Sequence, residues 1–529
     1  MLVQVLFLLC LKDNLTSDII IEETERKQER GVLHMKKILL IIICITACLG
    51  LLPSVCQAAS KKVVAQAEIV NGGDILISKA ILKNSKTDSG YNFDYIFKHV
   101  DDYIKEADYA VINLETSIGG KKIGYSGFPR FNTPESIVTA AKKAGFDMFL
   151  NASNHSYDLG YDALLYKVKV LDNKDVDYIG IRKDTKKSLH KVVDINGIKV
   201  GMLNYTRESW ISTEDRVVLN RFKSGENGEY EDVVVDQKAA SLIGRYHKNR
   251  TNEFYQRLEN DIKKHKNKGA ELIVVYPHWG TQYNIGVDKL EDKMAQKMCD
   301  LGVDVIVGGH PHVVEPVEVY TSEVSGKTTV CIHSTGNFVS SMSPTDSKIN
   351  NARYTRDGAL FSFTIKKYSD GSVAVTNAEV LPLYVYKNTK NKYMVIPLEK
   401  GKDWSKYGIA KYSKKKAGYY SYHRTKKLTD EGIEQFNAMP KISKQPVSCE
   451  VSAGKNAVYN ISVVGKNIKY QWQYSMDNGE TWKKVVIDGC NTAELTIEAS
   501  DFKNGRLFRC RVKNGTGTVY SKPAKIIVK

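Results

Sequence analysis

The chain has 529 residues, which is too long for one ordinary hydrophobic core, so we expect two or three domains. Its formal net charge of +17 at pH 7 indicates an anionic neighbour. No nucleic-acid-binding motif accompanies this charge, and the basic residues are scattered among tyrosines and acids. We therefore do not expect nucleic acid as a partner and favour an anionic polymer or an acidic lipid surface.

The first residues have the pattern of a secretory signal. Residues 35–37 are a basic start, residues 38–52 are apolar, and residues 56–58 can serve as a cleavage site. We interpret residues 1–34 as a mis-called upstream start and residues 35–58 as a signal peptide, with an uncleaved membrane anchor as the alternative. Both interpretations place the protein outside the cell, secreted or on the extracellular face of the membrane or wall.

Apolar runs alternate with amphipathic helical patterns from residue 63 onward. Helical periodicity is clear at 134–145, where Thr133 is a candidate N-cap before Pro134, and at 289–302. This alternation predicts a layered α/β domain. The apolar runs that read as strands lie at 64–78, 109–117, 147–153, 199–206, 271–280, 304–312 and 329–338.

Polar residues gather at the carboxyl ends of these runs, the edge where open α/β sheets collect their ligands. Taken alone, the His-Pro-His turn at 310–312 is weak evidence, because a histidine pair satisfied by surface or core contacts is equally common. Five strand ends that supply carboxylate, amide and imidazole groups instead predict a site for divalent metal ions. The candidate ligands are Asp74, Glu115, Asn154, His278, His310 and His312.

The ordered motifs GGDILIS, VINLETS, FNTPESIVTAAKKAGFDMFLNASNHSYDLG, VVYPHWG, VGGHPHVVEPVEVY and STGNF resemble one known family. It is the bacterial capsule synthesis family typified by the poly-γ-glutamate capsule protein CapA, and the likeness covers residues 64–397. That family is related to the calcineurin-like metallophosphoesterases, so the resemblance implies a four-layer α/β sandwich over residues 63–397. It also places the six candidate ligands on metal positions and His155 on the catalytic histidine.

The resemblance implies a role for each residue. Glu115 would bridge two ions, with Asp74 and His312 completing one site and Asn154, His278 and His310 the other. Two such ions clamp an in-line displacement.

His155 would protonate the leaving oxygen. Asp158 would orient that imidazole, or it is simply a turn or cap residue. Mn, Zn or Fe are all compatible with these ligands.

Three further polar residues are candidates for binding substrate. Asn113 and Asn337 are placed to line the pocket, with backbone capping in a turn as the alternative. Arg130 is placed to meet an anionic substrate, with a pairing to a surface carboxylate as the alternative.

The chain departs from the wider phosphoesterase superfamily at two ligand positions. That superfamily has a histidine where this chain has Leu76, and aspartate where it has Glu115, so both a site with one ion and a site with two ions are compatible with the sequence.

The remaining chain divides into a connector and a small β domain. Residues 398–440 are rich in lysine and tyrosine and predict a basic linker or wall-contacting segment, with a short helix at 430–438. Residues 441–529 have the strand and turn spacing of a β-sandwich. Trp472 and Cys510 resemble the central tryptophan and later cysteine of bacterial immunoglobulin-like domains, but the early cysteine is absent.

We therefore expect a capsule or poly-γ-glutamate biosynthesis factor at the cell surface. Its metal site would hydrolyse a phosphoester or a γ-glutamyl bond, and capsule synthesis or export membrane proteins are expected partners. The immunoglobulin-like domain would contact the cell wall or a polysaccharide. The alternative is a non-catalytic scaffold or polymer-binding component of a capsule exporter, because a fold by itself does not establish a reaction.

Overall fold

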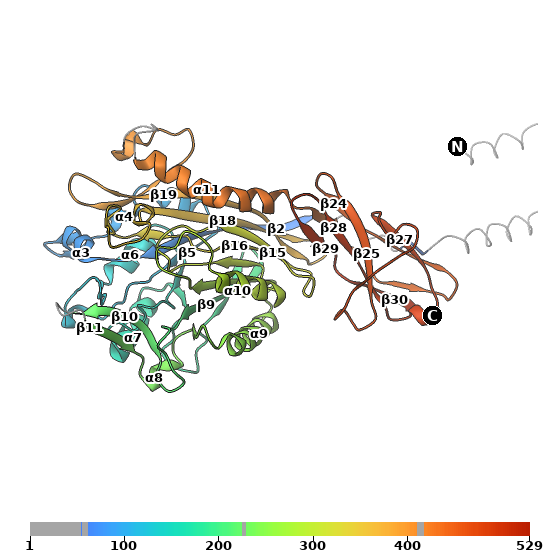
Figure 1. The fold of residues 1–529 in the computed structure, drawn as a ribbon, viewed down its shortest axis with the longest axis horizontal. Helices are drawn as coiled ribbons and strands as arrows, with labels where there is room; N and C mark the ends of the chain where they lie inside the picture. Colours follow the sequence, from blue (N-terminus) through green and yellow to red (C-terminus); the bar gives the residue numbers. More distant parts are fainter. Residues whose placement is uncertain (1–53, 56–61, 225–228, 410–416) are drawn as a thin grey trace, which may run out of the picture.

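The computed structural model describes residues 54–55, 62–224, 229–409 and 417–529 (Figure 1). An α/β part comes first and a β-rich C-terminal part follows, which confirms the predicted fold class at this level. The predicted upstream start lies outside the described residues, as does the predicted signal except for β1 (Ser54–Val55), which pairs in parallel with β23 (Asn456–Asn460). None of the helices in the described ranges is both long and apolar enough to cross a membrane.

The first sheet has eight strands and is built around β2 (Val63–Ile75). On one side of β2 the strands β5, β6 and β7 follow in parallel, as is usual for strands joined by crossover helices. On the other side β18, β19 and β20 are antiparallel, and β17 pairs with the end of β2. The bounds are β5 (Tyr109–Asn113), β6 (Met148–Leu150), β7 (Asp177–Ile179), β17 (Asn337–Val339), β18 (Asp357–Tyr368), β19 (Val373–Lys387) and β20 (Tyr393–Pro397).

The second sheet has seven strands in the order β12-β9-β13-β14-β16-β15, with β8 beside β9. Strands β9, β13, β14 and β16 are parallel, so their carboxyl ends share one edge. The bounds are β8 (Lys191–Ile195), β9 (Ile198–Arg207), β12 (Arg245–Tyr246), β13 (Leu272–His278), β14 (Val305–Val307), β15 (Val317–Thr321) and β16 (Thr328–Ile332). A separate hairpin, β10 (Val218–Ser224) and β11 (Glu229–Val234), stands apart from both sheets.

The two sheets face each other across an apolar core, and helices cover their outer faces. Side chains alternate along each strand, so on β5 Val111 packs between the sheets, whereas Ala110 and Ile112 pack toward the helices. The same alternation on β9 sends Met202 inward and Leu203 outward. The layer order is therefore helix, sheet, sheet, helix. The covering helices are α6 (Ser136–Lys143) and α7 (Tyr161–Asn173) on the first sheet, and α9 (Thr251–Asn267) and α10 (Lys289–Asp300) on the second.

One of the two predicted helix starts agrees with the structure and the other does not. A capping box between Asp288 and Glu291 starts α10 where the sequence predicts a helix. The predicted cap at Thr133 is wrong, because α6 begins at Ser136 and the buried Thr133 hydroxyl bonds the Thr116 hydroxyl instead. A tertiary hydrogen bond has therefore replaced the local one.

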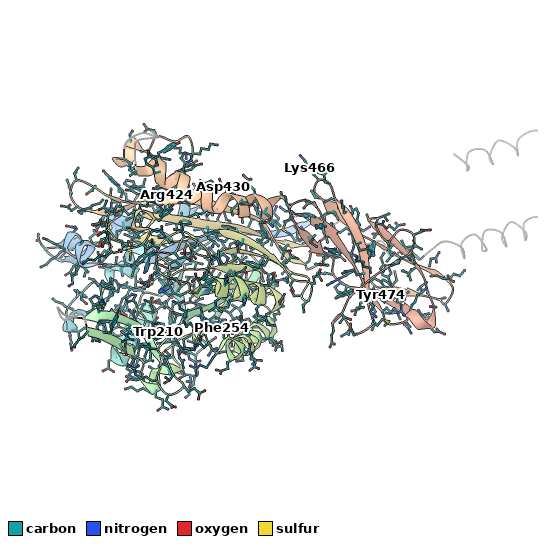
Figure 2. All side chains as sticks on the ribbon, in the orientation of Figure 1. Trp210, Phe254, Arg424, Asp430, Lys466 and Tyr474 are labelled. Carbon is teal, nitrogen blue, oxygen red and sulfur yellow. The ribbon has the colours of Figure 1, made fainter. Side chains whose placement is uncertain are left out.

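The basic segment predicted as a linker contains a longer helix than the one expected at 430–438. Residues Ala417–Ala438 form one long helix, α11, which lies along β18 and β19 and also contacts β15 of the second sheet (Figure 1). Its Arg424, labelled in Figure 2, forms a two-bond ion pair with the buried carboxylate of Asp357. The buried face consists largely of small residues, so no apolar periodicity revealed it: Gly418, Ser421, Thr425, Thr429 and Gly432.

The C-terminal part is made of short strands around Trp472, which is fully buried and pairs in register with Cys510. Cys510 is a free thiol, and Cys449 is disulfide-bonded, so the described chain has no Cys510 core disulfide. Tyr520 links this part to the first by donating a hydrogen bond to Glu323 at 2.9 Å. The bounds are β21 (Lys441–Lys444), β22 (Cys449–Val451), β24 (Ser462–Val464), β25 (Lys469–Ser475), β26 (Lys483–Lys484), β27 (Glu494–Glu498), β28 (Leu507–Lys513), β29 (Thr518–Tyr520) and β30 (Ala524–Val528).

Candidate metal centre

The candidate ligands converge from the carboxyl edges of both sheets. Asp74 stands near the end of β2, in register with Asn113 of β5, and Glu115 follows two residues later. On the second sheet His278 ends β13 and forms a bridge with Gly309, which follows β14. The two edges meet because the sheets pack face to face. All six predicted ligands are buried there: Asp74, Glu115, Asn154, His278, His310 and His312.

Two groups of three side chains in the described ranges are arranged so that they could hold an ion. One consists of Glu115, His278 and His310, and the other of Asp74, Glu115 and His312. Within each group the ligand atoms all lie within 4.8 Å of one another. Glu115 belongs to both groups, which is the sharing that the sequence resemblance implied. Asn154 joins the first group, since its Oδ1 lies 2.8 Å from Nε2 of His278.

Several ligand atoms of this cluster face one another without a hydrogen bond. Oε1 of Glu115 lies 3.3 Å from Nε2 of His278, and Oδ2 of Asp74 lies 3.5 Å from Nδ1 of His312. Both carboxylate oxygens of Glu115 and Nδ1 of His312 are buried with no hydrogen-bond partner. Unpartnered buried polar atoms are costly and uncommon. A cation between them would satisfy all of these atoms, so the residues present fit one or two divalent ions.

The turn that carries the two histidines is conformationally unusual. His310 has φ 99° and His312 has φ 61°, in a region of backbone conformation that residues other than glycine rarely adopt. The preceding glycines are required by close approach, because a Cβ at Gly308 would lie 1.9 Å from the carbonyl oxygen of His333. A Cβ at Gly309 would lie 2.8 Å from Oδ1 of Asp74. Such strained backbone is typical of functional sites.

Burial and neighbouring charges together set the pKa values of the cluster. Burial alone would raise the pKa of Glu115, but the imidazoles of His312 and His278 lower it to about 2. Burial, together with His278 and Arg207, lowers the pKa of His310 well below its usual range. For His312 burial also disfavours the charge, but Glu115 and Asp74 outweigh it and raise the pKa. The cluster therefore contains an ionised carboxylate beside a neutral imidazole, which are the forms that ligate metals.

His155 lies beside this cluster and is held by Asp158. Its Nδ1 is 2.8 Å from Oδ2 of Asp158, and its ring packs edge-on against Phe131 with ring centroids 4.7 Å apart. Asp158 also accepts a hydrogen bond from the amide of Phe131 at 2.9 Å, so it both orients the imidazole and anchors the chain. Burial would lower the pKa of His155, but Asp158 and Glu115 raise it. His155 therefore keeps its proton to a higher pH than it would if burial acted alone.

Two of the remaining predicted site residues contact metal ligands, and the third forms an ion pair. Asn113 donates a hydrogen bond to Oδ1 of Asp74 at 2.6 Å, and Asn337 donates to the backbone oxygen of His312 at 3.1 Å. Both thus position ligands. Arg130 forms an ion pair with Glu231 and stacks on Phe222, which agrees with the alternative that it pairs with a carboxylate. Leu76 is buried and offers no ligand atom.

Sequence reasoning missed the wall of the cavity above the cluster. This cavity has a volume of about 720 Å³, and Asn154, His278 and His310 lie at its metal-centre end. Arg207 could have been found from the sequence, because it directly follows the apolar run at 199–206 in the same way that His278 ends its own run. The missed residues along the wall include Arg207, Trp210 (labelled in Figure 2), Asn220, Arg221, Tyr230 and Lys248.

Lys167 was also missed, because it lies on a helix and not at a strand end. Its ammonium group is fully buried and donates to the carbonyl oxygens of Leu114 at 3.0 Å and Thr116 at 2.9 Å. Burial lowers the pKa of Lys167 to about 7, although Asp158 and Glu115 oppose the shift. Lys167 therefore clamps the backbone on both sides of Glu115.

One solved structure is similar to a short part of the chain. A chimeric titin Z1Z2 functionalized with a decorin peptide is 21% identical, covering 17% of this chain and 94% of that chain, with a TM-score of 0.14. That TM-score is too low to support a statement about fold.

Comparison with known sequences is more informative. The capsule biosynthesis protein CapA of Bacillus anthracis is 26% identical over 353 residues, covering 63% of this chain and 74% of that protein. The PGA biosynthesis protein CapA of Bacillus subtilis (strain 168) is 26% identical over 343 residues, covering 63% and 78% respectively. Residues 441–529 match a domain of unknown function (DUF8696). Residues 68–342, more than half of the chain, match the model for the bacterial capsule synthesis protein PGA_cap, and the chain therefore belongs to that family.

Proposed function

We propose that this protein takes part in capsule or poly-γ-glutamate biosynthesis as a divalent-metal-dependent hydrolase at the cell surface. The observation that carries the proposal is the carboxylate of Glu115, which is shared by two ligand groups and has no hydrogen-bond partner for either oxygen. The names of the two CapA relatives support the capsule role. The predicted signal at 35–58 supports the location.

Divalent ions, with Mn, Zn and Fe as candidates, would be held by the two groups that share Glu115. When bound, they supply Lewis-acid polarisation of the scissile bond and lower the pKa of water. The group containing His278 and His310 also has the amide oxygen of Asn154 beside it, whereas Leu76 adds nothing to the group of Asp74 and His312. We therefore expect the His278 group to bind its ion more tightly.

The protein side chains would handle positioning and the proton. Asp158 fixes Nδ1 of His155, so Nε2 is the atom that holds a proton for the leaving group. Asn113 holds the carboxylate of Asp74 through its 2.6 Å hydrogen bond. Lys167 holds the backbone on either side of Glu115. The scissile bond is a phosphoester or a γ-glutamyl amide, since both are open to the same chemistry.

The remaining expectations follow from the same resemblance. The layer order of the α/β part supports a metallophosphoesterase-like sandwich, and the short strands around Trp472 support an immunoglobulin-like C-terminal domain that contacts wall or polysaccharide. Capsule synthesis or export membrane proteins are the proposed partners. A non-catalytic scaffold is the second candidate, and the observation that favours it is the missing ligand at Leu76.

The proposal is tested by metal content and turnover of the full chain. The protein is loaded with Mn, Zn or Fe, its bound metal is measured by mass spectrometry, and it is assayed on a phosphodiester and on poly-γ-glutamate. His278→Ala is expected to lose metal and turnover together. His99→Ala changes a histidine that packs against Tyr407 and belongs to neither ligand group, and it is expected to keep both. If the wild-type protein binds no metal and has no turnover, the hydrolase proposal fails and the scaffold candidate remains.

A further inference from the structure

Two buried acids lie close to the histidine turn and take no part in the metal centre. Glu315 follows His312 by three residues, and Glu291 lies in the first turn of α10. Glu315 is 0% exposed and Glu291 is 3% exposed. Neither belongs to the ligand groups that share Glu115. Acids are rarely buried to this extent unless something compensates their charge, so both of these carboxylates need a partner.

Three carboxylate oxygens of these two acids have no hydrogen-bond partner in the described ranges. They are Oε1 and Oε2 of Glu315 and Oε1 of Glu291. Oε2 of Glu291 accepts a hydrogen bond from the amide of Asp288 at 3.1 Å, as part of the capping box of α10. Burial raises the pKa of Glu291 and the charge of Arg207 partly opposes this rise, but the described side chains of the two form no ion pair.

The two acids also lie close enough to act on each other. Burial raises the pKa of Glu315, and the negative charges of Glu291 and Asp288 raise it further. Asp288 is itself bonded by the hydroxyl of Thr281 at 2.6 Å and by the amide of Asn284 at 3.1 Å. A proton on Glu315 would reduce the repulsion, but the resulting hydroxyl would still lack an acceptor among the described groups. A cation between the two carboxylates satisfies the unpartnered oxygens and removes the repulsion.

Main-chain atoms approach this pair of acids directly. Gly280 has φ 82°, and a Cβ on it would lie 2.0 Å from Oε1 of Glu291 and 3.2 Å from Cγ of Pro311. Glu291 and the proline of the histidine turn therefore flank the same glycine. Trp279, the residue before it, is fully buried and donates a hydrogen bond to the carbonyl oxygen of His333 at 2.9 Å. Close backbone beside carboxylates is typical of sites in which carbonyl oxygens complete the ligand set of a hard cation.

We propose that Glu291 and Glu315 hold a calcium ion in a site separate from the metal centre. Their two charges match a divalent cation, and calcium takes carboxylate and carbonyl oxygens together. Magnesium fits less well, because it keeps several waters of its own, and manganese or zinc would favour imidazole ligands. The ion ties the first turn of α10 to the segment that follows His312. The site does not depend on the proposed reaction.

Calcium binding is measured on the full chain after treatment with chelator. Calorimetry with calcium chloride gives the number of ions per chain. Terbium, which replaces calcium in oxygen sites, gives their location, because its luminescence is excited by a nearby indole such as that of Trp279. The wild type is expected to bind calcium and to give a terbium signal that added calcium abolishes.

Three variants with matched changes locate the ion. Glu315→Gln and Glu291→Gln each remove one charge and keep the shape of the side chain, and glutamine at position 291 can still complete the capping box. Each is expected to weaken calcium binding about tenfold or more, since site affinity follows the number of charged ligands. Glu318→Gln is the control, because this partly buried acid already accepts a hydrogen bond from Tyr320 at 2.6 Å, and it is expected to bind calcium as the wild type does.

Thermal unfolding distinguishes a bound cation from a proton held by the acids. Without calcium, Glu315→Gln is expected to unfold at least at the temperature of the wild type, because a buried acid without a partner has been removed. With calcium the order is expected to reverse, since the wild type gains the binding free energy and the variant does not. A calcium concentration series that leaves the midpoint of the wild type unchanged would overturn the site and leave protonation as the explanation.

The metal-centre variant Glu115→Gln separates the two sites. It is expected to lose manganese and keep calcium, whereas Glu315→Gln is expected to lose calcium and keep manganese. Calcium lost in Glu115→Gln and kept in Glu315→Gln would place the ion in the metal centre and overturn the proposal, as would equal calcium affinity of the wild type and both folded glutamine variants at 291 and 315. If the wild type binds calcium in the expected pattern but has no manganese site and no turnover, the calcium site stands and the hydrolase proposal fails.

Discussion

Nδ1 of His155 lies 2.8 Å from Oδ2 of Asp158, three residues further along the chain. The pair is buried, and it stands next in sequence to Asn154, whose amide oxygen faces His278. A histidine oriented by a carboxylate has a fixed tautomer and a defined free nitrogen.

Replacing His155 by alanine should reduce kcat by about 10²–10⁴-fold, the usual contribution of a general acid. Bound metal should stay at the wild-type level, because His155 is not in either ligand group. Asp158→Asn should reduce kcat less than His155→Ala does, since the imidazole is kept but poorly oriented. Steady-state kinetics on the active substrate measure both variants, and unchanged kcat in His155→Ala would remove its proposed role.

Loss of Glu115 should remove both ions together. Glu115→Gln keeps the shape of the side chain but takes away the charge shared by the two ligand groups. Metal content should fall close to zero, and added Mn or Zn should no longer raise the thermal midpoint. In the wild type a metal concentration of about 100 times Kd should add about 2.7 kcal/mol of stability. Loss of only one of two ions in Glu115→Gln would show that the carboxylate is not shared.

Leu76→His should strengthen the weaker group. Residue 76 follows Asp74 by two positions, so along an extended segment the two side chains point to the same face. If the wild type binds one ion per chain, the added imidazole should raise the metal content toward two ions per chain. Leu76→Met, which keeps the apolar volume, is the matched control and should leave the metal content unchanged. An equal metal content in both variants would count against a second ion.

Lys167→Met should loosen the backbone around Glu115. The change leaves the carbonyl oxygens of Leu114 and Thr116 without their donor, at a cost of about 1–3 kcal/mol for each buried group. Metal affinity should fall as well, because the backbone on both sides of a ligand is freed. Urea unfolding and metal titration measure the two effects separately.

The stability loss in Lys167→Met should also depend on pH. Burial lowers the folded-state pKa of Lys167 to about 7, below its unfolded value, so the unfolded chain binds more protons between those two values. The contribution of Lys167 to stability therefore rises from about pH 7 toward the unfolded pKa. The difference in unfolding free energy between wild type and Lys167→Met should be larger at pH 9.5 than at pH 7. A difference that shrinks over this range would contradict the sign.

Gly432→Ala should detach part of α11. A Cβ at this position would lie 1.9 Å from the carbonyl oxygen of Val317, so the helix would have to move away from β15. We expect a loss of about 1–3 kcal/mol, in the range for overpacked positions. Glu431→Ala, at the neighbouring exposed position, should leave the unfolding midpoint nearly unchanged. Equal midpoints for the two variants would mean that α11 adjusts without cost.

The strand-end pattern was the strongest guide in the sequence, and the reason is physical. Parallel strands place their carboxyl ends at one edge, so topology brings Asp74 near Asn113 in the first sheet and His278 near Gly309 in the second. The two edges then meet because the sheets pack face to face. Lys167 could not be predicted in this way, because its partners are carbonyl oxygens, which have no sequence signature. Arg207 could have been inferred, because it directly follows the apolar run at 199–206.

The helix α11 shows a second limit of sequence reasoning. Its buried face is formed by small residues such as Ser421 and Thr425, so the usual apolar signal of an amphipathic helix is weak. Lysine and tyrosine dominate the preceding stretch and suggested a solvated linker. Thr133 illustrates the opposite error, since a valid local capping signal was overridden by its contact with Thr116.

Asp74 and Glu115 come from one sheet, whereas His278, His310 and His312 come from the other. An ion held between them would act as a removable cross-link between two layers that are also joined by their apolar core, the helix α11 and hydrogen bonds such as that from Tyr276 to Asn71. Sliding of one layer past the other would break the site before it broke either sheet. The geometry of the metal centre therefore depends on how the two sheets are aligned. A mutation that shifts one sheet relative to the other should weaken metal binding before it disrupts either sheet.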